Sequence, residues 1–501
     1  MPREIKRLVV VSNRLPVVLQ KDEQDNWQVI PGSGGLVTAL SPVLRNRGGL
    51  WIGWPGVDTD GSAEIAAVML ENDRRSGYRL LPVDLNPTEI EKYYNGFSNE
   101  VLWPLFHDMV SLCRFEPEYW PVYKDVNRKF ADAIAAYTNP EDYIWVHDYH
   151  LLLIASTLKQ MNVNRRTGFF LHIPFPPLDG FIKLPWRGDV LHAMLEYDLL
   201  GFQTMRDLRN FLECVRLLMP KSRTRGSGAV ITLHTPEREL RVGAFPISID
   251  FNDFVRRAGQ PETQREVERI EGLMPQTKVI LGLDRLDYSK GIPLRIRAFG
   301  EALATYPELR GNVALFQVVV PSRLDGERYQ QLKKEIDRLI GEINGKYSEA
   351  GWTPVHYLFR SLTDRELLAL YRRSDIALIT PLKDGMNLVS KEYCACSLDD
   401  NGVLILSEFA GAAAQMRQDA LLVNPFDIQG VAAAIHRAFH MDAAERKVHM
   451  RRLRRGIQRS NIFHWVDNFL RAAIARTIKD FPRLEDYVPA LDTATMQKEV
   501  A

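Results

Sequence analysis

The sequence has few cysteines, no long apolar run and no excess of charge of either sign. Four cysteines occur in 501 residues, which is too few for a disulfide scaffold. Cys394 and Cys396 form a lone C-x-C without the second pair that a structural zinc site requires. We therefore expect small buried thiols in a reducing compartment.

Long apolar segments are absent as well. No stretch of about 18 consecutive apolar residues occurs, so the sequence predicts no membrane span. The N-terminal valine run is interrupted at Ser12 and Asn13, too soon for the core of a signal peptide. These absences predict a cytoplasmic protein without a membrane partner.

Charge is balanced, with 64 lysines and arginines against 63 aspartates and glutamates and a net charge of +1. A nucleic-acid partner is not expected, because such proteins usually carry a basic excess. The basic run Arg451–Arg459 is interpreted as a solvated helix face. A local cationic pocket stays compatible with this balance.

Short apolar runs alternate with longer helical patterns along the chain. The runs are apolar on both faces and predict buried parallel strands at Leu8–Val11, Tyr143–Val146, Gly168–Leu171, Val279–Leu283, Val313–Val320, Ile376–Thr380 and Val403–Leu406. Apolar residues at three- and four-residue steps predict helices over Asn127–Ala136, Leu191–Leu200, Gln203–Leu218, Pro293–Ala304, Tyr329–Ile343 and Asp364–Arg373. This alternation predicts an α/β fold with helix-covered parallel sheets.

A boundary between two halves is predicted near residue 245. The stretch Gly226–Arg241 is polar and interrupted, and Phe245–Asp250 contains a proline and resembles an extended linker. A new strand–helix series begins at Lys278. Each half is long enough for its own core. The sequence leaves the oligomeric state open, a homo-oligomer included.

Two cations follow a predicted strand of the second half. Arg285 and Lys290 lie in Leu283–Gly291, directly after the strand, where open α/β sheets bind ligands. Two fixed cations beside a glycine suit a diphosphate. The alternative is a surface loop in which Arg285 pairs with Asp284 or Asp287.

A second polar segment of this half is Asp384–Glu392, with the sequence DGMNLVSKE, after the strand Ile376–Thr380. Consecutive backbone N–H groups and a carboxylate suit a sugar. Glu392 follows Asp384 by about two helical turns, so we expect both to face the same side. The alternative is helix capping by Asp384, with Glu392 in solvent.

The first half offers a cation, aromatic faces and a glycine-rich loop. Arg14 ends the first strand, and the aromatic residues Trp51, Trp54, Tyr93, Tyr94 and Trp103 follow. A fixed cation with apolar ring faces suits a phosphorylated sugar, whereas simple core packing accounts for at least two of these rings. The loop Pro31–Leu36 lacks the Lys-Ser/Thr of a phosphate loop. Its glycines fit a phosphate site at a helix start and a plain turn equally well.

Histidines follow two strands of the same half. His147 and His150 come after Tyr143–Val146, and His172 comes after Gly168–Leu171. The three-residue spacing of the first two, without an evident third ligand, predicts no metal site. A single buried histidine is more often a hydrogen-bonded core residue than a catalyst.

Taken in order, these motifs resemble the trehalose-6-phosphate synthase family, glycosyltransferase family 20. The resemblance rests on Ser12–Arg14, Gly34–Leu36, Gly49–Trp54, Tyr93–Asn99, Leu102–Pro104, His147–His150, Leu171–Pro176, Arg285–Gly291 and Asp384–Glu392. It implies the type B glycosyltransferase fold, in which two Rossmann-like domains face each other across a cleft and a C-terminal helix crosses back. The expected domains are residues 1–245 for the acceptor and 246–461 for the nucleotide sugar, with the crossing helix and a polar tail in 462–501.

The resemblance further implies a retaining, metal-independent glucosyltransferase of trehalose biosynthesis and osmoprotection, with no cofactor. It would move glucose from the nucleotide-sugar donor UDP-glucose to the phosphorylated acceptor glucose 6-phosphate. Two alternatives stay open: a glucosylglycerol-phosphate synthase that uses ADP-glucose and glycerol 3-phosphate, and a non-catalytic sugar-phosphate sensor. Departures from the family pattern at Pro177–Asp179 and Ser390 leave acceptor and donor preference open.

Site residues are carried over position by position, with no metal ligand among them. The implied catalytic residues are Asp148, His172, Arg285, Lys290 and Asp384. The implied donor-binding residues are Gly34, Gly35, Arg285, Lys290, Asp384, Gly385, Met386, Asn387, Leu388, Val389 and Glu392. The implied acceptor-binding residues are Arg14, Trp54, Tyr94, Trp103, Asp148 and Arg323.

Overall fold

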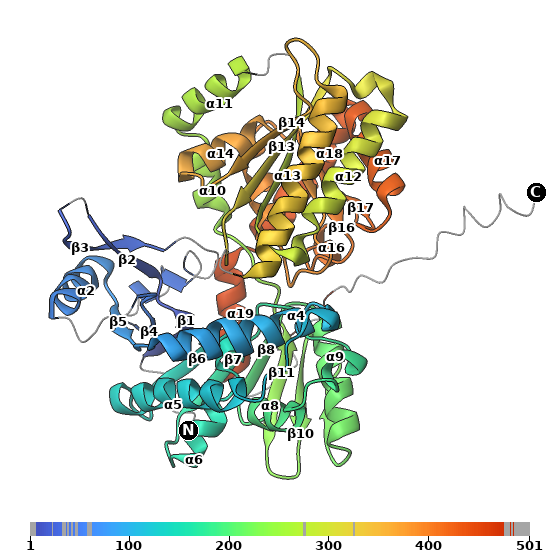
Figure 1. The fold of residues 1–501 in the computed structure, drawn as a ribbon. Coiled ribbons are helices and arrows are strands. Elements are labelled where there is room, and N and C mark those ends of the chain that lie inside the picture. The colour runs from blue at the N-terminus through green and yellow to red at the C-terminus, as the bar shows by residue number, and fades with distance from the viewer. Residues whose placement is uncertain are drawn as a thin grey trace, which may run out of the picture. The chain divides into compact units, whose positions relative to one another are not determined.

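The computed structural model describes residues 7–22, 24–32, 37, 40–41, 44–45, 49–57, 63–273, 277–323, 326–474, 481 and 484. The chain divides into two compact units (Figure 1). Unit 1 comprises Met1–Asn252 with Ile457–Leu484, and the described residues of unit 2 lie within Asp253–Gly456. Each unit is built on its own sheet, and the predicted α/β class with parallel sheets is confirmed.

The described strands of unit 1 form a nine-stranded sheet in the order β5-β4-β1-β6-β7-β8-β11-β10-β9. Its strands are β1 Leu8–Arg14, β4 Leu50–Trp54, β5 Arg79–Pro82, β6 Tyr143–His147, β7 Arg166–Phe170, β8 Leu199–Phe202, β9 Arg223–Arg225, β10 Val230–His234 and β11 Glu239–Ala244. In this order, every pairing from β5 through β11 is parallel, whereas β10 is antiparallel to both β11 and β9 at one edge. A separate hairpin pairs β2 Val17–Lys21 with β3 Trp27–Pro31.

The helices of unit 1 connect these strands. They are α2 Ala63–Ser76, α3 Pro87–Glu89, the π-helix η1 Ile90–Leu102, α4 Trp103–Phe106, η2 Val110–Leu112, α5 Tyr119–Tyr137, η3 Tyr149–Leu151, α6 Ile154–Gln160, α7 Leu178–Phe181, α8 Arg187–Met194, α9 Met205–Leu218 and α19 Ile462–Ile474. The π-helix has 13 residues. Such helices are rare and usually short, and they occur often at functional sites.

Unit 2 has a six-stranded, fully parallel sheet among its described residues, in the order β14-β13-β12-β15-β16-β17. Its strands are β12 Lys278–Arg285, β13 Val313–Val320, β14 Val355–Phe359, β15 Ile376–Ile379, β16 Val403–Ser407 and β17 Leu421–Val423. The helices are α10 Phe251–Ala258, which begins in unit 1, α11 Pro261–Leu273, η4 Tyr288–Lys290, α12 Ile292–Thr305, η5 Pro307–Leu309, α13 Glu327–Tyr347, α14 Asp364–Arg373, α15 Leu388–Cys396, α16 Ala413–Met416, α17 Ile428–His440 and α18 Ala443–Arg459.

Helix α19 packs on the sheet of unit 1, although it follows the described residues of unit 2 in the sequence (Figure 1). The Phe469 ring stacks on Trp145 of β6 at 4.3 Å between centroids, and the Trp465 ring lies 5.0 Å from the same indole. A Cβ at Gly201 of β8 would lie 2.7 Å from the Phe469 ring, so this close approach requires glycine. The side chains of Arg166 and Arg241 donate to the carbonyls of Ala473 and Ala472 in α19.

The structure corrects one sequence-based expectation of local structure. The helix predicted over Leu191–Leu200 ends at Met194, and strand β8 begins at Leu199. Asp198 aligns the chain with the sheet, because its backbone N–H and its carboxylate pair with the backbone of Thr167 in β7. The polar stretch Gly226–Arg241 contains β10 and the start of β11, whose polar side chains suit the antiparallel edge.

Two further features follow from the described residues. All four cysteines are free thiols, with Cys113 half-buried and the other three buried. Among the helices within the described ranges, none is both long and apolar enough to traverse a bilayer.

Candidate functional site

Lys290 and Asp384 form an ion pair beyond the carboxyl ends of strands β12 and β15. The Lys290 Nζ lies 2.5 Å from an Asp384 carboxylate oxygen, and the two side chains are 12% and 14% exposed. The loop is fixed locally, because Asp287 accepts a hydrogen bond from the Ser289 backbone at 2.9 Å. Gly291 has a φ of 64°, which lets the chain turn directly into α12. Both Lys290 and Asp384 were predicted as site residues from their positions after strands, and the structure brings their side chains into contact.

A second ion pair lies beneath this loop. The guanidinium of Arg295 is 2.6 Å from the carboxylate of Asp284, and both side chains are almost fully buried. Arg295 also donates to the Thr380 hydroxyl at 3.1 Å. Burial raises the pKa of Asp284, although the neighbouring charge of Arg295 opposes that rise. Asp284 therefore serves as a buried support of the loop rather than as the surface partner of Arg285.

Arg323 belongs to the same unit and approaches Asp287. Its guanidinium lies 3.9 Å from the Asp287 carboxylate and donates to the Tyr329 hydroxyl at 2.9 Å. Burial by itself would raise the pKa of Asp287, but the charges of Arg323, Arg285 and Lys290 lower it. Three cations thus share one edge of unit 2 with two carboxylates. The sequence-based interpretation considered Asp287 only as a surface partner of Arg285 and did not predict that it lies among these cations.

The segment that follows β15 differs from its predicted geometry. Helix α15 begins at Leu388, and its N-cap is Asn387, whose side chain accepts from the Ser390 backbone at 3.0 Å. Asp384 precedes the helix, so helical spacing does not relate it to Glu392, and the predicted helical geometry does not apply to this pair. Asp384 also does not cap the helix. It accepts instead from the Asn387 side-chain amide at 3.2 Å, in addition to its contact with Lys290.

The other predicted donor residues surround the start of α15. Gly385, Met386 and Asn387 are buried in the preceding turn, and Leu388 and Val389 are half-buried in the first helical turn. Glu392 accepts a hydrogen bond from the Tyr371 hydroxyl at 2.7 Å, and burial raises the pKa of its carboxyl group. The unpaired N–H groups at a helix start favour an anion or a sugar oxygen. Gly34 and Gly35 lie outside the described residues.

Arg14 of unit 1 lies against two aromatic rings. Its guanidinium carbon is 4.1 Å from the centroid of Trp54 and 5.6 Å from that of Tyr94, and the two rings are 5.7 Å apart. These residues come from β1, β4 and the π-helix η1. A Cβ at Gly56 would lie 2.1 Å from a nitrogen of Arg14, so this arrangement needs glycine there. The predicted combination of a cation with aromatic faces is present in the structure.

A row of rings extends from Tyr94 to Trp103. The His150 ring lies 5.8 Å from Tyr94 in a stacked arrangement, and it lies 4.0 Å from Tyr149. Trp103 is 5.8 Å from Tyr149, whose hydroxyl donates to the Asn99 side chain at 2.9 Å. The sequence identified Trp103 but gave Tyr149 and Asn99 no role. Both residues lie within motifs that carry the family resemblance, His147–His150 and Tyr93–Asn99, and this could have indicated them.

Asp148 and His172 contact each other at the ends of β6 and β7. The backbone N–H of His172 donates to the Asp148 carboxylate at 3.2 Å, and Asp148 has a φ of 73°. The His147 Nδ1 is 3.1 Å from the His172 Nε2. Burial lowers the pKa of both imidazoles, that of His172 to about 3, so both are neutral near pH 7. His147 faces His172, whereas His150 faces Tyr94, so these two histidines do not converge on one point.

Comparisons with known proteins agree with this architecture. Residues 6–475 match the sequence model of glycosyltransferase family 20. A trehalose-6-phosphate synthase of Mycobacterium bovis is 43% identical over 471 residues, which cover 93% of this chain and 94% of the relative.

Solved structures show the same likeness over nearly the whole chain. A UDP-forming α,α-trehalose-phosphate synthase from Burkholderia xenovorans, in complex with glucose 6-phosphate, has a TM-score of 0.83 and 34% identity and covers 93% of this chain and 99% of its own. An E. coli structure bound with UDP-2-fluoro glucose has a TM-score of 0.84 and 36% identity, covering 94% and 99%. The predicted family is therefore confirmed: the chain belongs to glycosyltransferase family 20.

Proposed function

We propose that this protein is a UDP-forming α,α-trehalose-phosphate synthase. It transfers glucose from UDP-glucose to the 1-hydroxyl of glucose 6-phosphate, with retention at the donor anomeric carbon, and releases UDP. Support comes from the identity of 43% to a trehalose-6-phosphate synthase over nearly the full length of both chains. The observation that carries the proposal is the cationic edge of unit 2, where Lys290 contacts Asp384 at 2.5 Å and Arg285 and Arg323 lie near Asp287.

The cations act on the leaving group. As the bond between the glucosyl carbon and the diphosphate oxygen breaks, negative charge develops on UDP. Arg285 and Lys290 stabilise that charge, which is worth most in a site that excludes water. A phosphate oxygen of the leaving group accepts the proton of the attacking hydroxyl. The proton therefore leaves with UDP, and the reaction needs no separate carboxylate base.

The donor sugar and nucleotide are held by the segment around α15. Asp384 and the backbone N–H groups of Gly385, Met386 and Asn387 bind the glucose hydroxyls. Glu392 binds the ribose, and Leu388 and Val389 line the nucleotide pocket. Because Lys290 contacts Asp384, a single ion pair couples the cation for the phosphate to the carboxylate for the sugar.

The acceptor is bound through its phosphate and its hydroxyls. Arg14 and Arg323 supply cations, and Trp54, Tyr94 and Trp103 supply ring faces and polar edges. Asp148 accepts from a sugar hydroxyl and also holds the His172 backbone at 3.2 Å. His172, kept neutral by burial, orients hydroxyl groups by hydrogen bonds and does not act as a cationic acid.

We also propose a cytoplasmic location for the protein. Its four cysteines are all free thiols, and Cys214, Cys394 and Cys396 are buried. Thiols of this kind persist in reducing compartments, where disulfides are rare.

A donor-by-acceptor matrix tests the proposed reaction. Purified protein is incubated with UDP-, ADP- or GDP-glucose and with glucose 6-phosphate or glycerol 3-phosphate, and nucleoside diphosphate release and product mass are measured. We expect the highest kcat/KM for UDP-glucose with glucose 6-phosphate. Product formed only with glycerol 3-phosphate would identify a glucosylglycerol-phosphate synthase instead. Absence of turnover with every pair, in protein that binds glucose 6-phosphate, would identify a sensor.

A further inference from the structure

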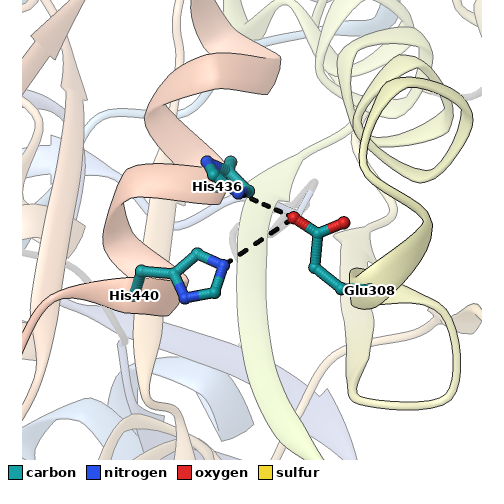
Figure 2. Close-up of side chains that lie close together, drawn as sticks. All are labelled: Glu308, His436 and His440. Atoms are coloured by element: carbon teal, nitrogen blue, oxygen red, sulfur yellow. Dashed lines mark hydrogen bonds and ion pairs between the residues drawn. The ribbon is translucent and has the colours of Figure 1, made fainter.

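Two histidines and one glutamate of unit 2 converge on a single point of the surface. The His436 Nε2 is 2.8 Å from a carboxylate oxygen of Glu308, and the His440 Nε2 is 3.8 Å from the same oxygen. Figure 2 shows both imidazoles directed at that carboxylate. One potential ligand atom from each of the three side chains lies within 4.8 Å of the others.

Helical spacing places the two imidazoles together. His436 and His440 are four residues apart on α17, so they lie on the same face one turn apart. Glu308 lies in η5, the short turn between α12 and β13. The three ligands are therefore supplied by two elements that are far apart in the sequence.

Neighbouring contacts hold these side chains in place. The Tyr306 ring stacks on His436 at 4.0 Å with an interplanar angle of 16°. Lys278, the first residue of β12, donates from its Nζ to the Phe439 carbonyl at 2.7 Å and ties the last turn of α17 to the sheet. These two contacts restrain the His436 ring and the turn that carries His440.

We propose that Glu308, His436 and His440 bind a divalent transition-metal ion of the Zn²⁺ class, with the remaining coordination position open to water. In a tetrahedral site with ligands about 2.0–2.1 Å from the metal, ligand atoms lie about 3.3–3.4 Å apart. The observed separations of 2.8 and 3.8 Å lie on either side of that value. Small rotations of half-exposed side chains therefore produce the tetrahedral arrangement.

The donor set selects the class of metal. Two imidazole nitrogens and one carboxylate oxygen suit Zn²⁺, Co²⁺, Ni²⁺ or Cu²⁺. Mg²⁺ and Ca²⁺ prefer oxygen ligands and would bind poorly here. The alternative is a plain hydrogen bond or surface ion pair between Glu308 and His436, which contributes little to stability.

The position of the cluster assigns it a structural role. Glu308 precedes β13, and α17 ends at His440 beside Lys278, so the cluster lies at the amino ends of the strands. Arg285 and Lys290 lie at the opposite, carboxyl edge of the same sheet. A bound ion would connect η5 to α17, whose residues Glu308 and His436 are 128 positions apart in the sequence. It would stabilise unit 2 without taking part in glucosyl transfer.

Metal binding and thermal unfolding of the full chain test this site. After treatment with a chelator, the protein is titrated with Zn²⁺ by calorimetry about one unit above the ordinary imidazole pKa, and Co²⁺ absorption reports tetrahedral geometry. We expect one Zn²⁺ per chain at this site and a higher unfolding temperature with Zn²⁺ than with Mg²⁺. His440→Ala and Glu308→Gln should each weaken Zn²⁺ affinity at least about tenfold, the minimum usually lost when a supporting contact is removed.

His449 provides a matched control. Its imidazole contacts the Asp419 carboxylate at 2.9 Å but has no second histidine one helical turn away. His449→Gln should therefore retain both the Zn²⁺ affinity and the thermal shift. Zn²⁺ binding that is absent, or unchanged in both His440→Ala and Glu308→Gln, would overturn the site. Turnover of metal-free His440→Ala should equal that of metal-free wild type, so failure of the proposed reaction and failure of the metal site are distinguishable.

Discussion

At the scale of single residues, the proposed chemistry depends most on the Lys290–Asp384 pair. Lys290→Ala removes a cation beside the leaving diphosphate and leaves a mostly buried Asp384 without its partner. Arg285→Ala removes the second cation assigned to the diphosphate. We expect each variant to lower kcat at least about a hundredfold, the usual loss for one electrostatic donor to a developing charge. Steady-state assays of UDP release measure this effect.

Arg297→Ala is the control for these variants. Arg297 is an exposed cation on α12 that pairs with Glu335 at 2.8 Å. Its removal deletes the same charge from the same unit away from the carboxyl edge, so turnover should stay near the wild-type value. Near-normal turnover in Lys290→Ala or Arg285→Ala would contradict the assigned role.

His172 predicts how stability depends on pH. Burial lowers the pKa of this imidazole to about 3, whereas an unfolded histidine has a pKa of about 6.5. Between these values the unfolded state binds more protons, so the free energy of unfolding falls as pH decreases through that range. Above about pH 6.5 this contribution is constant. Urea unfolding midpoints should therefore fall with acidity less steeply in His172→Asn than in wild type.

An exposed histidine serves as the control for His172→Asn. His192 is exposed on α8 of the same unit. His192→Asn should keep the pH dependence of the wild type. Equal acid sensitivity in His172→Asn and wild type would show that the buried imidazole does not contribute.

At the scale of elements, Arg454 of α18 holds the end of helix α15. Its guanidinium donates to the carbonyls of Cys394, Ala395 and Ser397 at 3.1, 2.6 and 2.8 Å. They lie where α15 ends and its regular hydrogen bonds run out, so the Cys394 carbonyl accepts from the nearby Ser397 N–H at 3.3 Å besides Arg454. The interpretation of Arg451–Arg459 as a uniformly solvated face is therefore wrong at Arg454, whose side chain is only 15% exposed.

Substitution of Arg454 should destabilise unit 2. Arg454→Ala leaves several buried carbonyls without a charged donor, and we expect a loss of about 2–3 kcal/mol in the free energy of unfolding. Arg455→Ala removes the neighbouring, exposed arginine of the same helix and should change stability by less than about 0.5 kcal/mol. Urea denaturation of both variants measures the difference. Equal stability of the two would show that the contacts of Arg454 contribute nothing.

At the scale of the whole molecule, the proposed donor-binding residues Lys290 and Asp384 belong to unit 2, whereas Arg14, assigned to the acceptor phosphate, belongs to unit 1. UDP at about a hundredfold excess over its Kd should stabilise the folded protein by about 2.7 kcal/mol. Lys290→Ala should largely remove the rise in unfolding temperature caused by UDP, whereas Arg14→Ala should keep it. Glucose 6-phosphate should stabilise wild type more than Arg14→Ala. Thermal scans with each ligand measure these shifts, and loss of the UDP effect in Arg14→Ala would contradict the division.

The whole-molecule charge is consistent with binding of anionic substrates by local clusters of cations. The net charge is +1, yet Arg285, Lys290 and Arg323 influence one carboxylate, Asp287. Two anionic substrates are therefore matched by local concentrations of cations rather than by an overall basic excess.

The sequence by itself determined much of the fold and the chemical character of the candidate site. Buried parallel strands such as Val313–Val320 are apolar on both faces, so composition predicts them without knowledge of neighbours. Arg14 ends β1, and Lys290 and Asp384 lie in the segments that follow β12 and β15; such strand ends are where α/β sheets place functional groups. The order of the motifs identified the family, which the comparison over residues 6–475 confirms.

Only the tertiary structure decided which side chains meet. Asp284 and Asp287 are neighbours in one motif, yet burial pairs the first with Arg295 and the second lies near Arg323. The convergence of Glu308 with the histidines of α17 has no sequence signature, because the partners are separated by 128 positions. Local patterns encode periodicity and propensity, whereas pairing over long separations depends on how helices pack on the sheet. For that reason the sequence predicted the elements and their chemical types, and packing determined the partners.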